Sequence, residues 1–310
     1  MLPKVVIFGS LNMDFVVRVP RLPAPGETAL GSDFQMIPGG KGGNQAFAAG
    51  RIGEGTVTAT MIGTVGYDMF ADHLKANLSV AGVDVSAVHA TKFAPTGVAL
   101  ICVDRSGQNS IVVASGANYA LSANDVEGLK AAFTGAAFAL FQLESPPPAV
   151  QAAITLARRL GARTILDPAP AQPLTRDLLD QVDVLTPNES EACLLLGQEV
   201  KRITKESARP VAAELLALGC RAVVLKLGDA GCFYYDGTRE ILAPGFRVEA
   251  VDSTAAGDIF NAAFAVALTE AKDIEQALVF ANAAAALSVT RHGAQSSVPS
   301  RSEVDAFLRS

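Results

Sequence analysis

The sequence contains few of the residues that build disulfide frameworks or zinc sites. Only four of its 310 residues are cysteines. They are scattered, with no C-x-x-C pair among Cys102, Cys193, Cys220 and Cys232. Disulfide scaffolds and zinc sites need several closely spaced thiols, so neither is expected here. The same thiol content is typical of a protein that works in a reducing, cytoplasmic environment.

Long hydrophobic runs and clusters of positive charge are also missing. No apolar run reaches the length of a bilayer-spanning helix. The first ten residues, MLPKVVIFGS, are typical of a buried strand and not of a signal peptide. We therefore expect no membrane partner. The formal net charge is −6 without a basic cluster, which argues against nucleic acid, because binding to the phosphate backbone needs a positive face.

Apolar residues, in contrast, make up 50% of the chain. Short strand-like runs alternate with helical patterns. Near-continuous apolar strands are those buried on both faces, so the alternation predicts an α/β fold, a mostly parallel central sheet flanked by helices on both faces. The predicted strands are 5–8, 57–62, 139–143, 164–166, 182–185 and 222–227, and the predicted helices are 44–51, 69–81, 149–160 and 211–218.

Two segments interrupt this alternation. Residues 14–37 and 97–114 are rich in β-forming residues, each looking like an antiparallel excursion. We interpret them as a small β-sheet lid, formed by about residues 11–37 and 95–114, within a single domain of residues 1–310. The alternative is that they are edge strands of the main sheet. Ligands of open α/β folds bind beyond the carboxyl ends of the strands, so a lid there would close over a site.

A glycine cluster, PGGKGGNQAFAAG, covers residues 38–50. It lacks the Ser or Thr after Lys41 that a Walker A loop requires, and Gln45 stands where G-x-G-x-x-G needs its third glycine. Such a cluster permits a ligand to approach the backbone closely, next to the free N–H groups of a helix start. Asn44 could hold a substrate hydroxyl or cap the helix, and taken alone the capping role is favoured.

Carboxylates follow two of the predicted strands. Glu144 is placed either for ligand contact or for capping the next helix, and spacing does not decide between them. Asn188 and Glu191 stand three residues apart at a helix start. Acidic residues in a first turn usually serve the helix dipole. Their functional interpretation is that they organise Mg²⁺ through its water shell.

The segment VDSTAAGDIFNAAF, residues 251–264, begins a helix that is apolar almost all round, which predicts burial. Ala255, Ala256 and Gly257 present N–H groups at its start, an anion hole for negative charge. An aspartate beside an anion site looks contradictory, because both the ligand and the side chain are negative. The two are compatible if they act in sequence: the N–H groups stabilise a phosphoryl group, and Asp258 takes a proton from the attacking hydroxyl. The alternative is a first-turn acid that stabilises the dipole.

Several motifs occur together and in order. Over essentially its full length the chain resembles the ribokinase-like (phosphofructokinase-B type) family of sugar kinases. The family implies an α/β core with a β-lid that forms a homodimer contact. It implies phosphorylation of D-ribose at O5 by ATP, giving D-ribose 5-phosphate and ADP, with Mg²⁺ and K⁺ as cofactors. The motifs are GSLNMD, GGKGGNQAFAAGR, LESP, DPAPA, TPNESE, DSTAAGD and VTRHGAQSSVP.

Carried over position by position, the resemblance implies the roles of the site residues. Asp258 would be the general base. The sugar would contact Asn12, Met13, Asp14, Gly40, Lys41, Gly42, Gly43, Asn44 and Glu144. The nucleotide would contact Asn188, Lys226, Leu227, Gly228, Asp229, Ala230, Gly231, Gly257 and Asn282. K⁺ would be held, mostly by backbone carbonyls, at Asp252, Thr254, Ser288, Arg291, Gly293 and Ser297.

The chain departs from the commoner family pattern at Ser253, Ala255, Ile259 and Lys226. A small hydroxyl residue is common at the position of Lys226, so changed nucleotide affinity is expected. A related kinase acting on 2-deoxyribose, another pentose or hexose, or a nucleoside is the alternative function. A non-catalytic sugar sensor is the alternative from another class, although it would be expected to lack the base or the anion hole.

Overall fold

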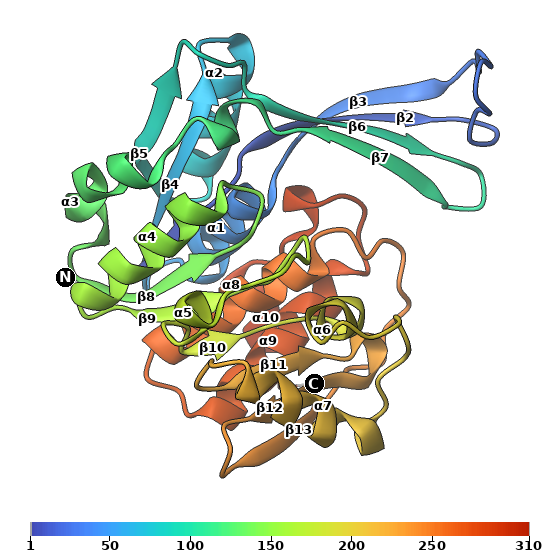
Figure 1. The fold of residues 1–310 in the computed structure, drawn as a ribbon. Coiled ribbons are helices and arrows are strands. Elements are labelled where there is room, and N and C mark those ends of the chain that lie inside the picture. Colours follow the sequence, from blue (N-terminus) through green and yellow to red (C-terminus); the bar gives the residue numbers. More distant parts are fainter. Residues whose placement is uncertain (1, 310) are drawn as a thin grey trace.

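The computed structural model describes residues 2–309, which form two β-sheets and the helices around them (Figure 1). The larger sheet has nine strands in the order β13-β12-β11-β10-β9-β8-β1-β4-β5. From β11 to β5 every neighbouring pair is parallel, and only β12 and β13 add in antiparallel fashion. The strands are β1 Lys4–Phe8, β4 Thr58–Gly66, β5 Val83–Thr91, β8 Ala136–Phe141, β9 Arg163–Leu166, β10 Val184–Leu185, β11 Val223–Lys226, β12 Gly231–Tyr235 and β13 Glu240–Pro244.

Helices cover both faces of this sheet, as predicted. Alternate residues of β1 show the division, since Val5 and Ile7 belong to one buried cluster and Val6 and Phe8 to the other. The first face holds α1 Lys41–Ile52, α2 Met69–Val80, α8 Ala256–Thr269, α9 Ile274–Ser288 and α10 Arg301–Phe307. The second holds α3 Lys130–Phe133, α4 Pro147–Arg159, α5 Arg176–Leu179, α6 Glu189–Leu195 and α7 Lys205–Ala217. Four short 3₁₀ helices are η1 Gly116–Tyr119, η2 Ala123–Leu129, η3 Gly228–Ala230 and η4 Gln295–Ser297.

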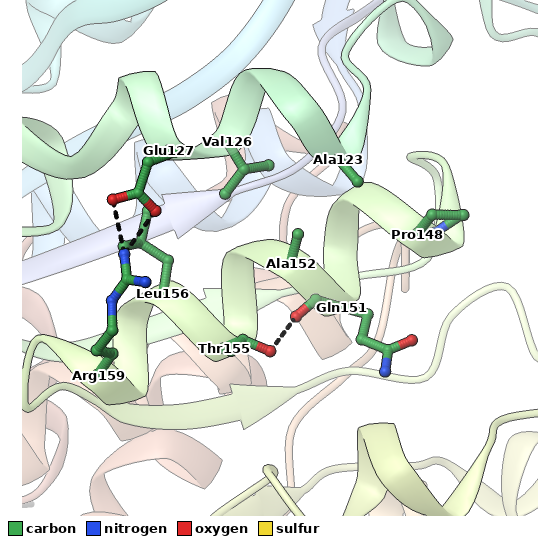
Figure 2. Close-up of a pocket in the computed structure, with 9 residues that line it drawn as sticks. All are labelled: Ala123, Val126, Glu127, Pro148, Gln151, Ala152, Thr155, Leu156 and Arg159. Carbon is green, nitrogen blue, oxygen red and sulfur yellow. Dashed lines mark hydrogen bonds and ion pairs between the residues drawn. The ribbon is translucent and has the colours of Figure 1, made fainter.

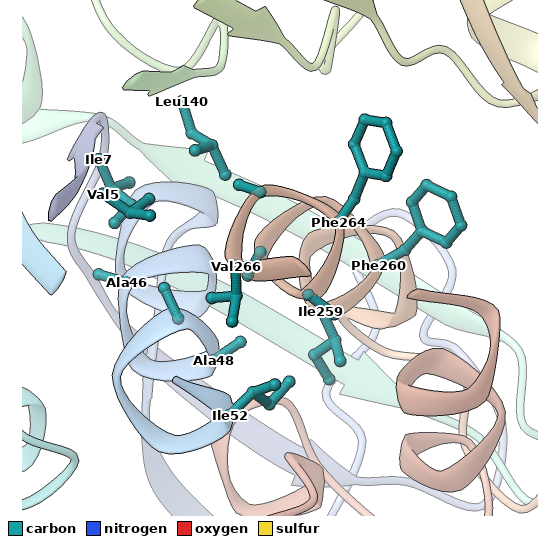
Figure 3. Packing of buried hydrophobic residues seen from close by; sticks show 14 of the residues in the cluster. Val5, Ile7, Ala46, Ala48, Ile52, Leu140, Ile259, Phe260, Phe264 and Val266 are labelled. Carbon is teal, nitrogen blue, oxygen red and sulfur yellow. The ribbon is translucent and has the colours of Figure 1, made fainter. Parts of the chain in front are cut away.

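Helix α8 lies in the centre of the first face. From Ile259 to Ala267 no residue is more than 3% exposed. Figure 3 shows Ile259 and Val266 of this helix beside Ala48 and Ile52 of α1. A helix that is apolar all round needs such complete burial, and its enclosure fixes the direction in which its N-terminus points.

The structure contains three strands of the large sheet that the apolar pattern does not predict, β5, β12 and β13. β5 alternates buried and exposed residues, and β13 lies at the other edge with Leu242 exposed. β5 and β13 are the edge strands of this sheet and have a neighbour on one side only, so their sequences need not be continuously apolar. β12 lies between β11 and β13 and is buried at four of its five residues, so this explanation does not apply to it. Among residues 2–309, no helix combines the length and apolarity that a membrane crossing requires.

The second sheet has four strands, β2 Asn12–Arg18, β3 Ser32–Gly39, β6 Gly97–Val103 and β7 Asn109–Ala114, in the order β3-β2-β6-β7. We call it the small sheet. Each of its two hairpins is antiparallel, and the hairpins join through a parallel pair, β2 with β6. It projects from the body of the molecule (Figure 1). The alternative of edge strands on the main sheet is therefore wrong, because these strands bond only among themselves.

Candidate active site

A polar pocket of about 450 Å³ lies at the carboxyl edge of the large sheet. Residues that follow β9, β10 and β11 meet the N-termini of α1 and α8 there, as expected for an open α/β sheet. Its lining consists of Lys41, Asp167, Ala169, Asn188, Glu189, Ser190, Glu191, Lys226, Gly228, Ser253, Ala255, Ala256, Gly257 and Asp258. The pocket thus brings together the predicted base, the predicted anion hole and part of the predicted nucleotide site.

The Asp258 carboxylate, in the first turn of α8, is buried, with the residue 6% exposed. It accepts hydrogen bonds from Asn44 Nδ2 and Gln45 Nε2, each at 3.1 Å. Burial raises the pKa of Asp258 to about 6, although the positive charge of Lys41 opposes the shift. A carboxylate that only stabilised the helix dipole would gain nothing from such desolvation. The position therefore favours a role in proton transfer.

The anion hole differs from the prediction at one residue. Ala255 precedes α8 in the left-handed conformation, at φ 59°. The Ala256 N–H donates to Ser253 O at 3.2 Å, so it is already engaged in a turn. The first turn of a helix leaves its N–H groups without partners inside the helix, and Gly257 retains such a free donor beside the pocket. The hole is therefore narrower than the three predicted residues.

Asn44 and Gln45 lie in the first turns of α1, which begins at Lys41 after Gly40. The favoured capping role of Asn44 is wrong, because its side chain reaches Asp258 instead. Gln45 is a site residue that the sequence did not indicate. It is fully buried and donates to both Asp258 and Asp167. The sequence did contain a signal for it, because a lone glutamine in an alanine-rich helical run indicates a buried polar residue with a specific partner.

The glycines at the start of α1 pack closely against other parts of the chain. At Gly40, with φ 82°, an added Cβ would lie 2.8 Å from Asn12 N. At Gly42 it would lie 2.6 Å from Gly9 C. The glycines therefore let α1 approach the end of β1 closely. Close approach of a ligand to the same backbone stays a prediction. At Gly43 an added Cβ would lie 3.2 Å from the Leu11 side chain, a less severe approach.

Glu144 does not cap the helix that follows it, since α4 begins after Pro146 without a side-chain cap. Its Oε2 instead accepts from Ser10 Oγ at 2.6 Å and from the Lys41 N–H at 3.1 Å. Glu144 therefore joins the end of β1 to the start of α1. Burial alone would lower the pKa of Lys41. The negative charges of four nearby carboxylates outweigh burial and raise this pKa; they belong to Asp258, Asp167, Glu144 and Glu191.

The start of β2 places Asn12 and Asp14 beside this junction. Asn12 is buried and its Oδ1 accepts from Asn118 Nδ2 at 2.7 Å. Burial, with the charge of Glu144 in second place, raises the pKa of Asp14 to about 7. Met13 is 1% exposed and packs in the core, so the structure gives its side chain a packing role and not the predicted contact with the sugar.

Asn188 and Glu191 form a capping box at the start of α6. The Asn188 side chain accepts from the Glu191 N–H at 2.8 Å, and Glu191 Oε2 accepts from the Asn188 N–H at 2.8 Å. Both residues also line the pocket. Burial raises the pKa of Glu191, with Lys226 opposing it. The helix-start role is thus present, and the carboxylate still faces the pocket.

The predicted nucleotide loop is only partly in the pocket. Lys226 and Gly228 line it, whereas Leu227 is buried and Asp229 is exposed beside Arg202 at 3.4 Å. Gly228 and Gly231 have φ values of 57° and 96°, a conformation that favours glycine. Ala230 and Asn282 of the predicted nucleotide site do not line the pocket. Ala230 is half-buried. Asn282 donates to the carbonyls of Ala243 and Pro244, which fixes α9 against β13.

The two segments predicted to hold K⁺ do come together. Asp252 accepts from the N–H groups of Thr254 and Gly293, each at 2.9 Å, and Val251 N–H donates to Val289 O. Ser288 and Ser297 donate their hydroxyls to local carbonyls. The Arg291 guanidinium pairs with Glu303. Arg291 can therefore contribute only its carbonyl, as the resemblance implies.

A second hollow, of about 380 Å³, lies between η2 and α4 (Figure 2). The ion pair of Arg159 with Glu127 crosses one end of it. None of the predicted site residues lines it, so the carboxyl-edge pocket is the candidate active site.

The comparisons with known proteins agree with this geometry. Residues 2–301 match the pattern of the pfkB family carbohydrate kinases. A ribokinase of Haemophilus influenzae is 41% identical over 302 residues, 97% of each chain. The structure of Arabidopsis thaliana ribokinase complexed with ribose and ATP matches with a TM-score of 0.90 and 34% identity over 100% of both chains. A deoxyribokinase of Salmonella typhi is 33% identical over 305 residues, 98% of each chain.

The chain belongs to the pfkB family of carbohydrate kinases. Its fold is the ribokinase-like fold, and the family confirms the resemblance that its motifs carry.

Proposed function

We propose that this protein transfers the terminal phosphoryl group of ATP to O5 of D-ribose, giving D-ribose 5-phosphate and ADP. One observation carries the proposal: the buried Asp258 carboxylate and the N-terminal N–H end of α8 share one pocket. Phosphoryl transfer needs a positioned nucleophile and stabilised charge more than covalent chemistry. The relatives named ribokinase, and the related structure with ribose and ATP, support the substrates.

In this reaction Asp258 takes the proton from O5 of the sugar as O5 attacks the phosphorus. A pKa of about 6 leaves the carboxylate ionised at neutral pH, yet a stronger base than an exposed aspartate. Asn44 and Gln45 hold its two oxygens by hydrogen bonds, which orient the carboxylate. The N–H at Gly257 and the end of the α8 dipole face the charge that develops on the transferring group.

The sugar site would be formed by Asn12, Asp14, Gly40, Lys41, Gly42, Gly43, Asn44 and Glu144. Several short acceptors are suited to a polyhydroxylated ligand, because each hydroxyl can donate to a carboxylate or amide oxygen. The Lys41 N–H to Glu144 bond connects this side to the phosphoryl pocket. The nucleotide would lie along Asn188, the loop 226–231 and Asn282.

Two cations belong to the proposal. Mg²⁺ usually keeps several waters and binds through one or two carboxylates plus substrate phosphates. Asn188 and Glu191, the pair proposed to organise Mg²⁺ through its water shell, both line the pocket. Among residues 2–309 no group of three or more His, Cys, Asp or Glu residues could hold a metal alone. This donor set fits a cation that arrives with the nucleotide. Bound Mg²⁺ would neutralise phosphate charge.

The oxygen-only donors around Asp252 fit K⁺. The Asp252 carboxylate and the carbonyls of 252–254 and 288–297 lie in joined segments next to the start of α8. We expect activity to rise when K⁺ replaces a large organic cation in the buffer. Equal rates in the two salts would refute this cation site.

The test of the function is a coupled assay for ADP release with purified protein, ATP and Mg²⁺, run in parallel with ribose, 2-deoxyribose and fructose. We expect the highest kcat/KM with ribose. A higher value with 2-deoxyribose would favour the alternative that the similar deoxyribokinase suggests. No sugar-dependent ADP at all would indicate a non-catalytic sugar sensor.

We also propose a homodimer through the small sheet. Six of its large apolar side chains are at least 46% exposed: Phe34, Met36, Leu100, Ile111, Val112 and Val113. The strand register places Met36, Leu100 and Val112 on one face of the sheet, and Ile111 and Val113 on the other. Exposed apolar surface of this extent indicates an interaction surface. Replacing Ile111 and Val112 by aspartate should shift the mass in solution from dimer to monomer. An unchanged mass by light scattering contradicts the proposed contact.

A further inference from the structure

Lys226, the last residue of β11, carries its ammonium into the pocket beside the start of α8. Its Nζ lies 2.9 Å from Asp167 Oδ1, and the side chains of the pair are 12% and 4% exposed. The same Nζ lies 3.3 Å from the position that a Cβ on Gly257 would occupy. The backbone of Lys226 is fixed, because its N–H donates to Pro187 O at 2.9 Å.

The pairing with Asp167 leaves part of this ammonium unused. A lysine has three N–H donors, and Asp167 accepts one of them. Within residues 2–309, Asp167 is the one side chain that hydrogen-bonds to Lys226 Nζ. Burying a charged donor without partners is costly. Two donors therefore face a pocket in which an anionic ligand could accept them.

The electrostatic setting points the same way. The N-terminus of a helix carries partial positive charge, so a cation there is unfavourable unless an anion joins them. The Lys226 ammonium lies at such an end, next to Gly257. Its ion pair with Asp167 balances the charge of the ammonium but not the partial positive charge of the helix end. A lysine meant only to neutralise Asp167 would not need to contact the start of α8. The arrangement becomes favourable when a phosphate occupies the space between the ammonium and the helix end.

We propose that Lys226 is a further catalytic residue for the proposed reaction, which binds the terminal phosphate of ATP during transfer, and that Asp167 positions it. This inference rests on the proposed function. As the bond from sugar O5 to the γ-phosphorus forms, the bond from that phosphorus to the β,γ-bridging oxygen breaks, and its electron pair leaves with ADP. The proton of O5 goes to Asp258. The ammonium keeps its protons throughout and stabilises the negative charge on the γ-phosphate and bridging oxygens.

The test compares Lys226→Met and Lys226→Arg with Lys201→Met, an exposed lysine outside the pocket, as the matched control. A charge-assisted hydrogen bond of about 1.5–3 kcal/mol corresponds to a loss of about 10–100-fold. We expect Lys226→Met to lower kcat/KM for ATP by about that factor, with the affinity for ribose and for AMP unchanged. Lys226→Arg should restore part of the rate, and the control should match the wild type.

Calorimetric titration with ATP and with AMP separates this inference from the proposed function. If the wild type releases no ADP with ribose, the proposed function fails, whereas weaker ATP binding with unchanged AMP binding in Lys226→Met still supports a contact with the outer phosphates. Rates and ATP affinity within twofold of the wild type would overturn the inference. So would a parallel loss of ribose, AMP and ATP affinity with a lowered Tm, because that pattern indicates a structural pair with Asp167.

Discussion

The two sides of the proposed sugar site differ in how they are held. Asp258 belongs to α8, whose following residues are completely buried, and its carboxylate accepts two amide hydrogen bonds. Asp14 belongs to β2 of the small sheet, which projects from the body and exposes much of its apolar surface (Figure 1). Under the proposed function, the proton transfer that depends on a fixed geometry lies in the core, and the contacts that admit and release the sugar lie on a sheet that projects from the body.

The largest effect is expected on the core side. Asp258→Asn and Asp258→Ala should lower kcat by about 10²–10⁴-fold, while ribose still binds, because a general base typically contributes that factor. Steady-state kinetics and ribose titration measure both quantities. Asp72→Asn, at an exposed acid in the first turn of α2, is the control for a purely dipolar role. Equal small effects at both positions would contradict the base assignment.

The stability of Asp258→Asn provides an internal check. A carboxyl whose pKa is raised on folding contributes stability below its unfolded pKa, and that contribution is lost as the pH rises through the folded pKa, here about 6. At pH 8 the ionised carboxylate is therefore a burden to the fold. The asparagine variant should have a Tm equal to or above that of the wild type at pH 8, which separates lost chemistry from lost folding.

On the side of the small sheet, Asp14→Asn should raise the KM for ribose by about 10–100-fold and change kcat much less, because a hydrogen bond to a charged acceptor is worth about 1.5–3 kcal/mol. Steady-state kinetics at saturating ATP measure the two parameters separately. A loss confined to kcat would remove the distinction between the two sides of the site.

The pH profile should report the core side. Below about pH 6, kcat/KM for ribose should fall about tenfold per pH unit as Asp258 becomes protonated. Asp14, with a pKa of about 7, titrates nearby, so the profile should be measured in wild type and in Asp14→Asn. The acidic limb should persist in the variant. Its disappearance there would assign the limb to Asp14.

The smallest effect concerns the backbone at the start of α8. Ala255 has φ 59°, and a non-glycine residue in that region costs about 1–2 kcal/mol. Ala255→Gly removes the strain but loses about 0.5–1 kcal/mol in backbone entropy, so a net gain of at most about 1.5 kcal/mol is expected. Ala271→Gly, at φ 61° outside the pocket, is the matched control. A lowered Tm at position 255 alone would contradict this explanation.

The sequence predicted the elements around Asp258 better than it predicted the hydrogen-bond partners of this residue. The apolar run after Gly257 required a buried helix, and the alternation of strands and helices required a two-faced sheet. The partners of Asp258 could not be predicted in this way. Gln45 is 213 residues away along the chain and Asn44 is 214 away, so only the packing of α1 against α8 brings them together. Local propensity favoured a cap at Asn44 because it contains no tertiary information.

Lys226 and Asp167 illustrate the same limit. Lys226 ends β11 and Asp167 directly follows β9. In the sheet β10 lies between these two strands. Their ion pair depends on strand order, which the periodicity of a single sequence does not specify. The glycine cluster shows a related limit. Its tight spacing correctly indicated a close approach to the backbone, but it did not indicate that one partner in that approach is the backbone at Gly9.

The way the small sheet is joined to the body has a mechanical consequence. β2 leaves the site at Asn12, and β3 returns to it at Gly39, immediately before Gly40 and α1. Both strands thus join the body at the end that forms the proposed sugar site, where Phe15 of β2 also packs against Phe70 of α2. A tilt of the small sheet would pivot at this junction. It would open or close the entrance to the proposed sugar site and leave the proposed proton acceptor on α8 in place.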